Sequence, residues 1–89
     1  MISHTTDRFW KAFALLPQRV QQQAEKAYGQ WKADPDYQGL HFKCIHQTKS
    51  VYSIRIGIGY RALGRRHGDE MIWFWIGTHE AYNELIKRL

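Results

Sequence analysis

The spacing of the apolar residues changes once along this chain, and that change limits what it can fold into. Between residues 6 and 33 the apolar side chains recur every three or four positions, as on the buried face of a helix. We expect a first helix over Thr6–Leu16 and a second over Pro17–Ala33, because proline suits a first helical turn, where its missing N–H needs no partner. The apolar stripe of the second helix consists of Val20, Ala24, Ala27, Tyr28 and Trp31.

After residue 39 the apolar residues alternate with polar ones, which is typical of strands. Short glycine-containing breaks separate these segments, and a final helical stripe carries Tyr82, Leu85, Ile86 and Leu89. The pattern predicts one α+β domain over residues 1–89: an N-terminal antiparallel helix pair packed on a three- to four-stranded antiparallel sheet, with a C-terminal closing helix. The expected strands are 40–46, 51–57, 60–66 and 71–77, with a possible short strand at Ile2–His4.

Alternation also predicts which side chains share a face of this sheet. We expect one face to pack on the helices, with Tyr52, Ile54 and Ile56 of one strand and Ile72, Phe74 and Ile76 of another. The open face would then carry polar and aromatic side chains. Because an unpaired core arginine is costly, Arg61 is expected on that face too. The expected open-face set is Ser53, Arg55, Arg61, Trp73, Trp75 and His79.

The chain is basic, with 13 Lys and Arg against 8 Asp and Glu and a net charge of +5. A basic balance is typical of proteins that bind nucleic acid or an acidic partner, although an ordinary soluble protein can show it as well. The single cysteine, Cys44, cannot form an intramolecular disulfide and is expected to be a packed core thiol. No apolar run is long enough to span a membrane, so a cytoplasmic protein without a membrane partner is expected.

Arginine and histidine on one open face suggest chemistry on a phosphate. The planar guanidinium group binds two phosphate oxygens at once, and imidazole exchanges protons near neutral pH. Fixed cations with a proton-transfer group meet the needs of RNA cleavage by its own 2′-hydroxyl, and exposed indoles can stack on unpaired bases. No metal or other cofactor is expected, because the histidines lack ligand-like pairing with cysteine or carboxylates. They are His4, His41, His46, His67 and His79.

Each of these residues also has a purely structural interpretation. The tryptophans can be core residues, His79 can be an ordinary helix-start residue, and Lys43 and Lys49 can be ordinary surface lysines. Arg65 and Arg66 precede a turn and can simply be solvated. Spacing alone therefore supports an anion-binding sheet and does not name the substrate.

Four short motifs, in this order and spacing, resemble the RelE/ParE toxin superfamily. They follow the two helices as Leu-His-Phe-Lys at 40–43, Val-Tyr-Ser-Ile-Arg-Ile at 51–56, Gly-Tyr-Arg-Ala-Leu at 59–63 and Gly-Thr-His-Glu-Ala-Tyr at 77–82. The similarity extends from about Phe9 to the end of the chain. The Gly-Thr-His that ends the last strand is similar to that of the YafQ branch.

This resemblance implies the toxin of a type II toxin–antitoxin pair. RelE-like members enter the ribosomal A site and cut mRNA there without metal, and a cognate antitoxin blocks them. By position, Arg61 would clamp the phosphate, Arg55 would stabilise the reacting oxygens, His79 would act as general acid or base, and Tyr82 would orient the nucleotide. The free toxin is expected to be a monomer that forms an oligomer with its antitoxin. The residues expected to guide RNA are Lys43, Lys49, Arg65, Arg66 and Trp75.

The chain also departs from the family's pattern. Ser53 stands where the RelE pattern has a lysine, so part of the usual proton-transfer set is missing. The ParE branch shares the fold but poisons DNA gyrase, and it does not usually carry the Gly-Thr-His. A relative that binds its antitoxin but cuts nothing is the third alternative.

Overall fold

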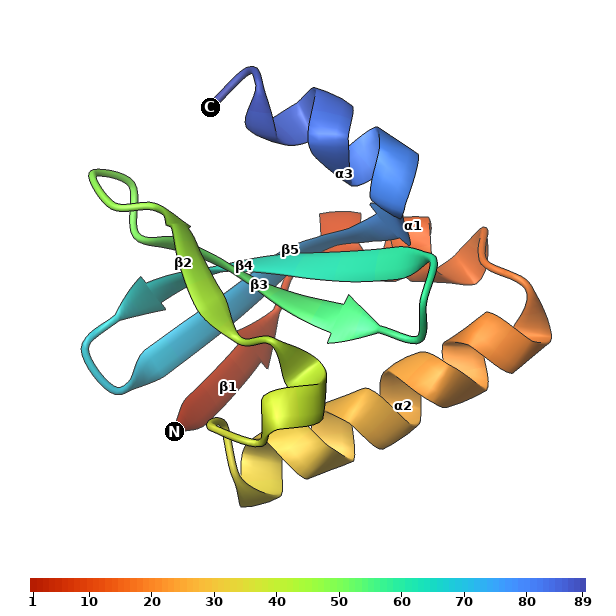
Figure 1. The fold of residues 1–89 in the computed structure, drawn as a ribbon, viewed down its shortest axis with the longest axis horizontal. Helices are drawn as coiled ribbons and strands as arrows, with labels where there is room; N and C mark the ends of the chain where they lie inside the picture. Colours follow the sequence, from red (N-terminus) through yellow and green to blue (C-terminus); the bar gives the residue numbers. More distant parts are fainter.

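The computed structural model describes all residues from Met1 to Leu89, and it has a five-stranded sheet with helices on both faces (Figure 1). In Figure 1, α2 lies below the sheet and α3 above it. The strand order is β1-β5-β4-β3-β2, so the N-terminal strand lies at one edge. The elements are β1 (Ile2–Thr5), α1 (Asp7–Ala14), α2 (Gln18–Ala33), the 3-10 turn η1 (Gln38–Leu40), β2 (Lys43–His46), β3 (Val51–Ile56), β4 (Tyr60–His67), β5 (Glu70–Thr78) and α3 (His79–Ile86).

The predicted fold class is confirmed, and the sheet has one strand more than expected. The segment Ile2–Thr5 pairs with Glu70–Trp73, and this pairing is parallel, so the sheet is mixed rather than purely antiparallel. Ser3 accepts a hydrogen bond from the hydroxyl of Tyr28 at 2.8 Å, which ties this edge strand to α2. A four-residue strand carries too few alternations for its pairing partner to be predicted from sequence.

Helix α2 forms the larger core because one of its faces is fully apolar. Val20, Ala24, Ala27 and Trp31 are buried, at the spacing that the sequence predicts. Trp31 meets Trp73 edge to face, with ring centroids 5.2 Å apart. The core on this face of the sheet also contains Leu40, Ile54, Ile56, Ala62, Met71 and Ile76.

Helix α1 is short and packs on β5. Thr6 caps its N-terminus by accepting a hydrogen bond from the backbone N–H of Phe9 at 3.1 Å. The corner between α1 and α2 is held by the side-chain amide of Gln21, which donates to the carbonyl oxygens of Phe13 and Leu16 at 3.1 and 3.3 Å. Both predicted N-terminal helices are therefore present. None of the three helices combines the length and the apolar character that a membrane span requires.

A register shift between β4 and β5 reverses the expected alternation along half of β5. Leu63 pairs with Trp75 but Gly64 pairs with Trp73, so Phe74 is the additional residue of a bulge. Phe74 and Trp75 consequently both pack on the α3 face, whereas Trp73 is buried under α2. The prediction that Phe74 and Ile72 lie inside with Ile76 was wrong, as was that of an outward Trp73. The expected inner set Tyr52, Ile54 and Ile56 of β3 is confirmed.

The expectation of a packed core thiol was also wrong. Cys44 is exposed on β2, which is an edge strand of only four residues. On an edge strand without a covering helix, alternation does not imply burial.

Gly64 lies where the bulge leaves no room for a side chain. A Cβ there would be 2.5 Å from Cε of Met71, 2.8 Å from Cε3 of Trp73 and 3.1 Å from the carbonyl oxygen of Ile72. Gly29, on the exposed side of α2, has nothing within 4 Å of the same position.

We predict that Gly64→Ala lowers the free energy of unfolding by about 1–3 kcal/mol, because the added methyl group overpacks the bulge. Gly29→Ala should instead raise it by about 0.5–1 kcal/mol, as alanine is the better helix former. Urea denaturation of the three proteins measures both effects. Equal stability of the Gly64→Ala variant and the parent would contradict the bulge packing.

Candidate functional site

Arg55 and Arg61 are cross-strand partners on the sheet face that carries α3. The β3–β4 hairpin pairs them directly, and Gly77 of β5 lies on the other side of Arg61. Neither guanidinium forms an ion pair: Nε of Arg55 donates to the carbonyl oxygen of Gly57 at 2.9 Å, and Nη1 of Arg61 donates to that of Tyr60 at 2.8 Å. Each arginine is therefore fixed by a neutral backbone acceptor and keeps its charge available to an anion.

Arg55 stands at an open edge of the sheet. Strand β2 begins at Lys43, opposite Ser53, so the rest of β3 as far as Ile56 has no paired strand on that side. Arg55 lines a shallow groove of about 240 Å³ there, together with Gln23 and Lys26 of α2. Its guanidinium thus joins the edge of the sheet to the face that carries Arg61.

The surroundings of Arg61 disfavour its charged form. Partial burial is the largest cause that lowers the pKa of its guanidinium, the neighbouring charge of Arg55 lowers it further, and Tyr82 acts in the opposite direction. A guanidinium still remains protonated at physiological pH. A bound anion would offset both the burial of the guanidinium and the repulsion by Arg55.

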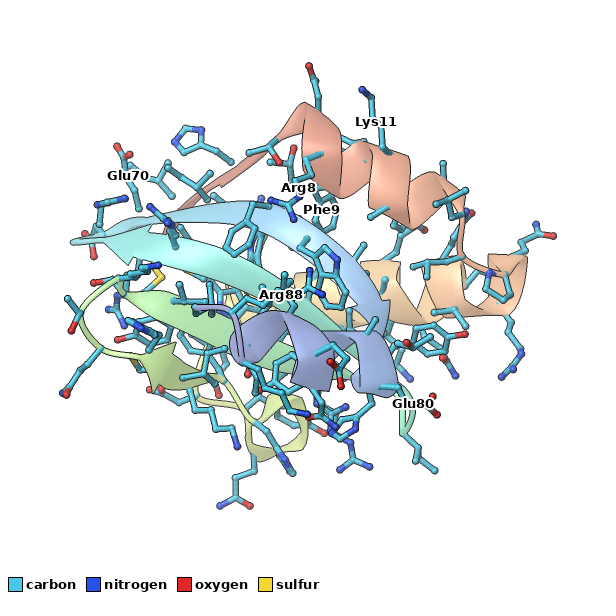
Figure 2. The ribbon with its side chains drawn as sticks, turned by 90° about the horizontal axis from the view of Figure 1, so that it is seen from above. Arg8, Phe9, Lys11, Glu70, Glu80 and Arg88 are labelled. Carbon is cyan, nitrogen blue, oxygen red and sulfur yellow. The ribbon has the colours of Figure 1, made fainter.

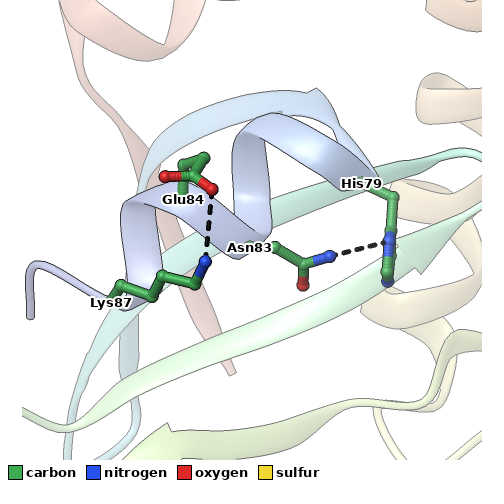
Figure 3. Close-up of polar contacts among 4 residues, drawn as sticks. All are labelled: His79, Asn83, Glu84 and Lys87. Carbon is green, nitrogen blue, oxygen red and sulfur yellow. Dashed lines mark hydrogen bonds and ion pairs between the residues drawn. The ribbon is translucent and has the colours of Figure 1, made fainter.

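His79 is the first residue of α3, where the helix leaves β5. Its backbone N–H donates to the carbonyl oxygen of Gly59 at 2.8 Å, which holds the start of α3 against the β3–β4 turn. Thr78 caps the helix by accepting a hydrogen bond from the backbone N–H of Ala81 at 3.1 Å. Figure 3 shows Asn83, one turn further along, with its Nδ2 3.3 Å from Nδ1 of His79.

Tyr82 links His79 to Arg61. Its ring centroid is 5.7 Å from that of His79, and the residue contributes to the electrostatic environment of Arg61. Only 6% of Tyr82 is exposed, because it packs with Val51 and Leu63 in the smaller core. The four residues expected to be catalytic therefore lie at one corner of the sheet, but Tyr82 does not offer an open ring face.

The residues expected to guide RNA do not form one surface. Lys43 pairs with Ser53 in register with Leu63 and Trp75, so it belongs to the face of the arginine pair. The ring of Trp75 lies over Gly77, within 2.6 Å of where a Cβ would stand.

Arg65, Arg66 and Lys49 lie elsewhere. Arg65 is on the α3 face near the C-terminal end of that helix, whereas Arg66 is on the opposite face, 5.4 Å above the ring of Tyr52. Lys49 is exposed in the β2–β3 turn, where its backbone N–H donates to Nδ1 of His46. Neighbouring arginines on a strand point to opposite faces, and this separates Arg65 from Arg66.

No carboxylate forms an ion pair with Arg55, Arg61 or His79 at this corner. Lys87 and Glu84 form an ion pair at 3.3 Å, which is drawn in Figure 3, and the imidazole of His4 lies 3.8 Å from the carboxylate of Glu70, an ion pair only when the imidazole is protonated. No three His, Cys, Asp or Glu side chains are grouped closely enough to hold a metal ion. What the corner offers is two guanidinium groups and an imidazole.

Sequence reasoning missed Asn83 and Gly77. Asn83 follows His79 by four residues, a spacing that places both side chains on the same side of a helix, so the signal was present. Gly77, the pairing partner of Arg61, leaves room for the ring of Trp75, and the sequence does not reveal that close approach.

Comparison with known proteins gives one matching family and several solved structures of the same fold. The model of a family described as the ParE-like toxin domain matches residues 18–84. Among solved structures, YafQ from E. coli strain BL21(DE3) superposes with a TM-score of 0.72 at 10% identity, covering 90% of this chain and 94% of that one. No curated protein matches by sequence.

Two further structures have the same fold. The RelB-RelE antitoxin-toxin complex from Methanococcus jannaschii gives a TM-score of 0.70 at 17% identity, over 92% of this chain and 96% of that one. The isolated E. coli RelE toxin gives 0.67 at 20% identity, over 98% and 96%. At these identities the likeness concerns the fold.

We predict that the arginine pair binds an oxyanion such as sulfate. Sulfate at ten times its dissociation constant should stabilise the protein by about 1.4 kcal/mol beyond its general salt effect. Arg61→Gln should lose this increment, whereas Arg19→Gln, a change of an exposed and unpaired arginine on α2, should keep it. Thermal unfolding in sulfate and in chloride of equal ionic strength measures the difference. Stabilisation by sulfate that persists in the Arg61→Gln variant would show that the anion binds elsewhere.

Proposed function

This chain belongs to the ParE-like toxin domain family, within the RelE/ParE toxin superfamily, and we propose on that basis that it is the toxin of a bacterial toxin–antitoxin pair. Its partner would be a cognate antitoxin protein, as RelB is the antitoxin of RelE in the similar complex from Methanococcus jannaschii. The free toxin would be a cytoplasmic monomer that assembles into an oligomer with its antitoxin.

We propose further that the toxin is a metal-independent endoribonuclease that cuts mRNA in the ribosomal A site and so inhibits translation. One observation carries this proposal: Arg55 and Arg61 pair across the strands without carboxylate partners, and the strand that pairs with Arg61 at Gly77 leads two residues later to His79 at the start of α3. Phosphoryl transfer needs fixed cations around a phosphate and a group that moves a proton, and this corner supplies both.

In the proposed reaction the 2′-hydroxyl of the RNA attacks the adjacent phosphate. A bond forms from the 2′-oxygen to phosphorus, the bond to the 5′-oxygen breaks, and the developing charge on the phosphorane is stabilised by Arg61 and, from the sheet edge, by Arg55. His79 acts as the general acid in its protonated form, in which both ring nitrogens carry a proton. It gives the proton on Nε2 to the departing 5′-oxygen and becomes neutral, and the proton of the 2′-hydroxyl passes to water.

Tyr82 would support this site from the smaller core, in which it is buried. With its ring packed in the smaller core, it is suited to holding Arg61 and His79 in position, and the nucleotide itself would contact other groups. Lys43 and Trp75 share the face of the arginine pair and would receive the mRNA, while Lys49, Arg65 and Arg66 would meet ribosomal RNA on other sides of the molecule.

Poisoning of DNA gyrase is the second candidate function, because the matching family is described as ParE-like. A relative that only binds an antitoxin is the third, because Ser53 is buried at the place of the family's lysine. The convergence of His79 with the arginines favours the nuclease over both, as neither alternative needs a proton-transfer group.

We predict that expression of the protein without its antitoxin arrests bacterial growth, and that Arg61→Ala or His79→Ala relieves the arrest. Loss of one such group should reduce the cleavage rate about 10²–10⁴-fold. Lys11→Ala, which removes an exposed charge from the side of α1 that points away from the sheet (Figure 2), should remain toxic. Mapping of mRNA 3′ ends after induction shows whether the cuts lie within codons.

Two outcomes would contradict the nuclease. Arrest with intact mRNA and stalled DNA replication would identify the gyrase alternative. The absence of arrest, in a protein that is shown to be folded, would identify the inert alternative.

A further inference from the structure

A second groove lies on the α3 face, between the start of α1 and the end of α3. Its volume is about 350 Å³. Arg61 and Arg65 are four residues apart on β4, or about 13 Å along the strand, and Leu63 between them is buried with Tyr82 of α3. Helix α3 therefore separates this groove from the arginine pair. The groove is lined by Thr6, Arg8, Arg65, Ile72, Phe74, Leu85 and Leu89.

The two arginines of the groove have no partner. Both Arg8 and Arg65 are exposed, and neither forms an ion pair or a side-chain hydrogen bond. The guanidinium carbon of Arg8 stands 6.0 Å from the ring centroid of Phe74, which places the cation against the floor of the groove. In Figure 2, Arg8 lies on the side of α1 that faces the sheet, whereas Lys11 points away from it.

The floor of the groove is apolar and incompletely covered. Ile72, Phe74, Leu85 and Leu89 are all partly exposed, and contiguous exposed apolar side chains mark interaction sites. Three of these four are aliphatic, and Arg8 lies against the ring of the fourth, Phe74. Aliphatic walls and an occupied ring suit the apolar side chains of a peptide better than the flat face of a nucleotide base.

We propose that this groove is a binding site for an acidic peptide segment with apolar side chains, contributed by the antitoxin. Carboxylates of the segment pair with Arg8 and Arg65, and its apolar side chains cover the floor between them. The identity of the partner rests on the proposed toxin–antitoxin function. The binding chemistry rests only on two unpaired cations that border an uncovered apolar floor on a chain of net charge +5.

The test uses purified full-length protein carrying Arg61→Ala, so that toxicity does not limit its production. The probe is a fluorescent peptide with three repeats of Glu-Leu-Glu-Glu-Leu, titrated by fluorescence anisotropy. We expect binding that weakens about tenfold when Arg8→Gln and Arg65→Gln are combined, since both charge-assisted contacts are lost. The matched control Lys11→Gln removes an equal charge from α1, on the side away from the sheet, and should change affinity less than twofold.

Other outcomes overturn the proposal. They are the absence of peptide binding, equal affinity of the double variant and the control, and equally tight binding of the same peptide with lysine in place of glutamate. A short oligouridylate whose affinity falls more than that of the peptide in the double variant would make the groove part of the RNA surface instead.

A substitution of Arg8 alone separates this inference from the proposed function, because Arg8 is the arginine of the groove that has no part in RNA binding. In the parent background, Arg8→Gln should still arrest growth if the groove serves the antitoxin. Arrest together with failed peptide binding would reject the groove alone, and peptide binding without arrest by the parent would reject the nuclease alone.

Discussion

The register shift between β4 and β5 determines which side chains reach each face of this small sheet. One additional residue at Phe74 sends Trp73 under α2, where its ring packs edge to face on Trp31, and leaves Trp75 on the α3 face. The shift thereby divides the interior into a large core beneath α2 and a smaller one beneath α3. Because α3 rests on the smaller core, the position of its first residue, His79, also depends on this bulge.

The sheet also presents arginines whose positive charges no acidic side chain neutralises. The β3–β4 hairpin brings two arginines side by side, and the groove beyond α3 holds two more, yet no carboxylate pairs with any of them. Stability alone would favour counter-ions at such places, since like charges in contact repel. Proteins commonly retain such unfavourable arrangements at functional sites, where a ligand supplies the missing charge. Two sites on one face, divided by α3, would let RNA and an acidic protein be recognised separately.

The sequence predicted what depends on local pattern and failed where distant pairing decides. Helix spacing identified the buried face of α2, alternation identified the inner side of β3, and the cost of burying a charge placed Arg61 on the face of Arg55. The parallel strand at Ile2–Thr5 was only a possibility, because four residues do not specify a partner. Phe74 was assigned to the wrong face, since a bulge leaves no mark in the hydrophobic period. Exposure of Cys44 followed from its place at an edge, which is a property of the whole sheet.

Cleavage of RNA at this corner through attack by its own 2′-hydroxyl is measured with purified protein and ribosomes programmed with a defined mRNA. A single 2′-deoxynucleotide is placed at the mapped cleavage position, and the cleavage rate is compared with that of the all-ribose message. If the 2′-hydroxyl is the nucleophile, the all-ribose message is cleaved rapidly, its upstream fragment carries a 2′,3′-cyclic phosphate, and the deoxy-substituted message is not cleaved. Equal cleavage of both messages would contradict this mechanism.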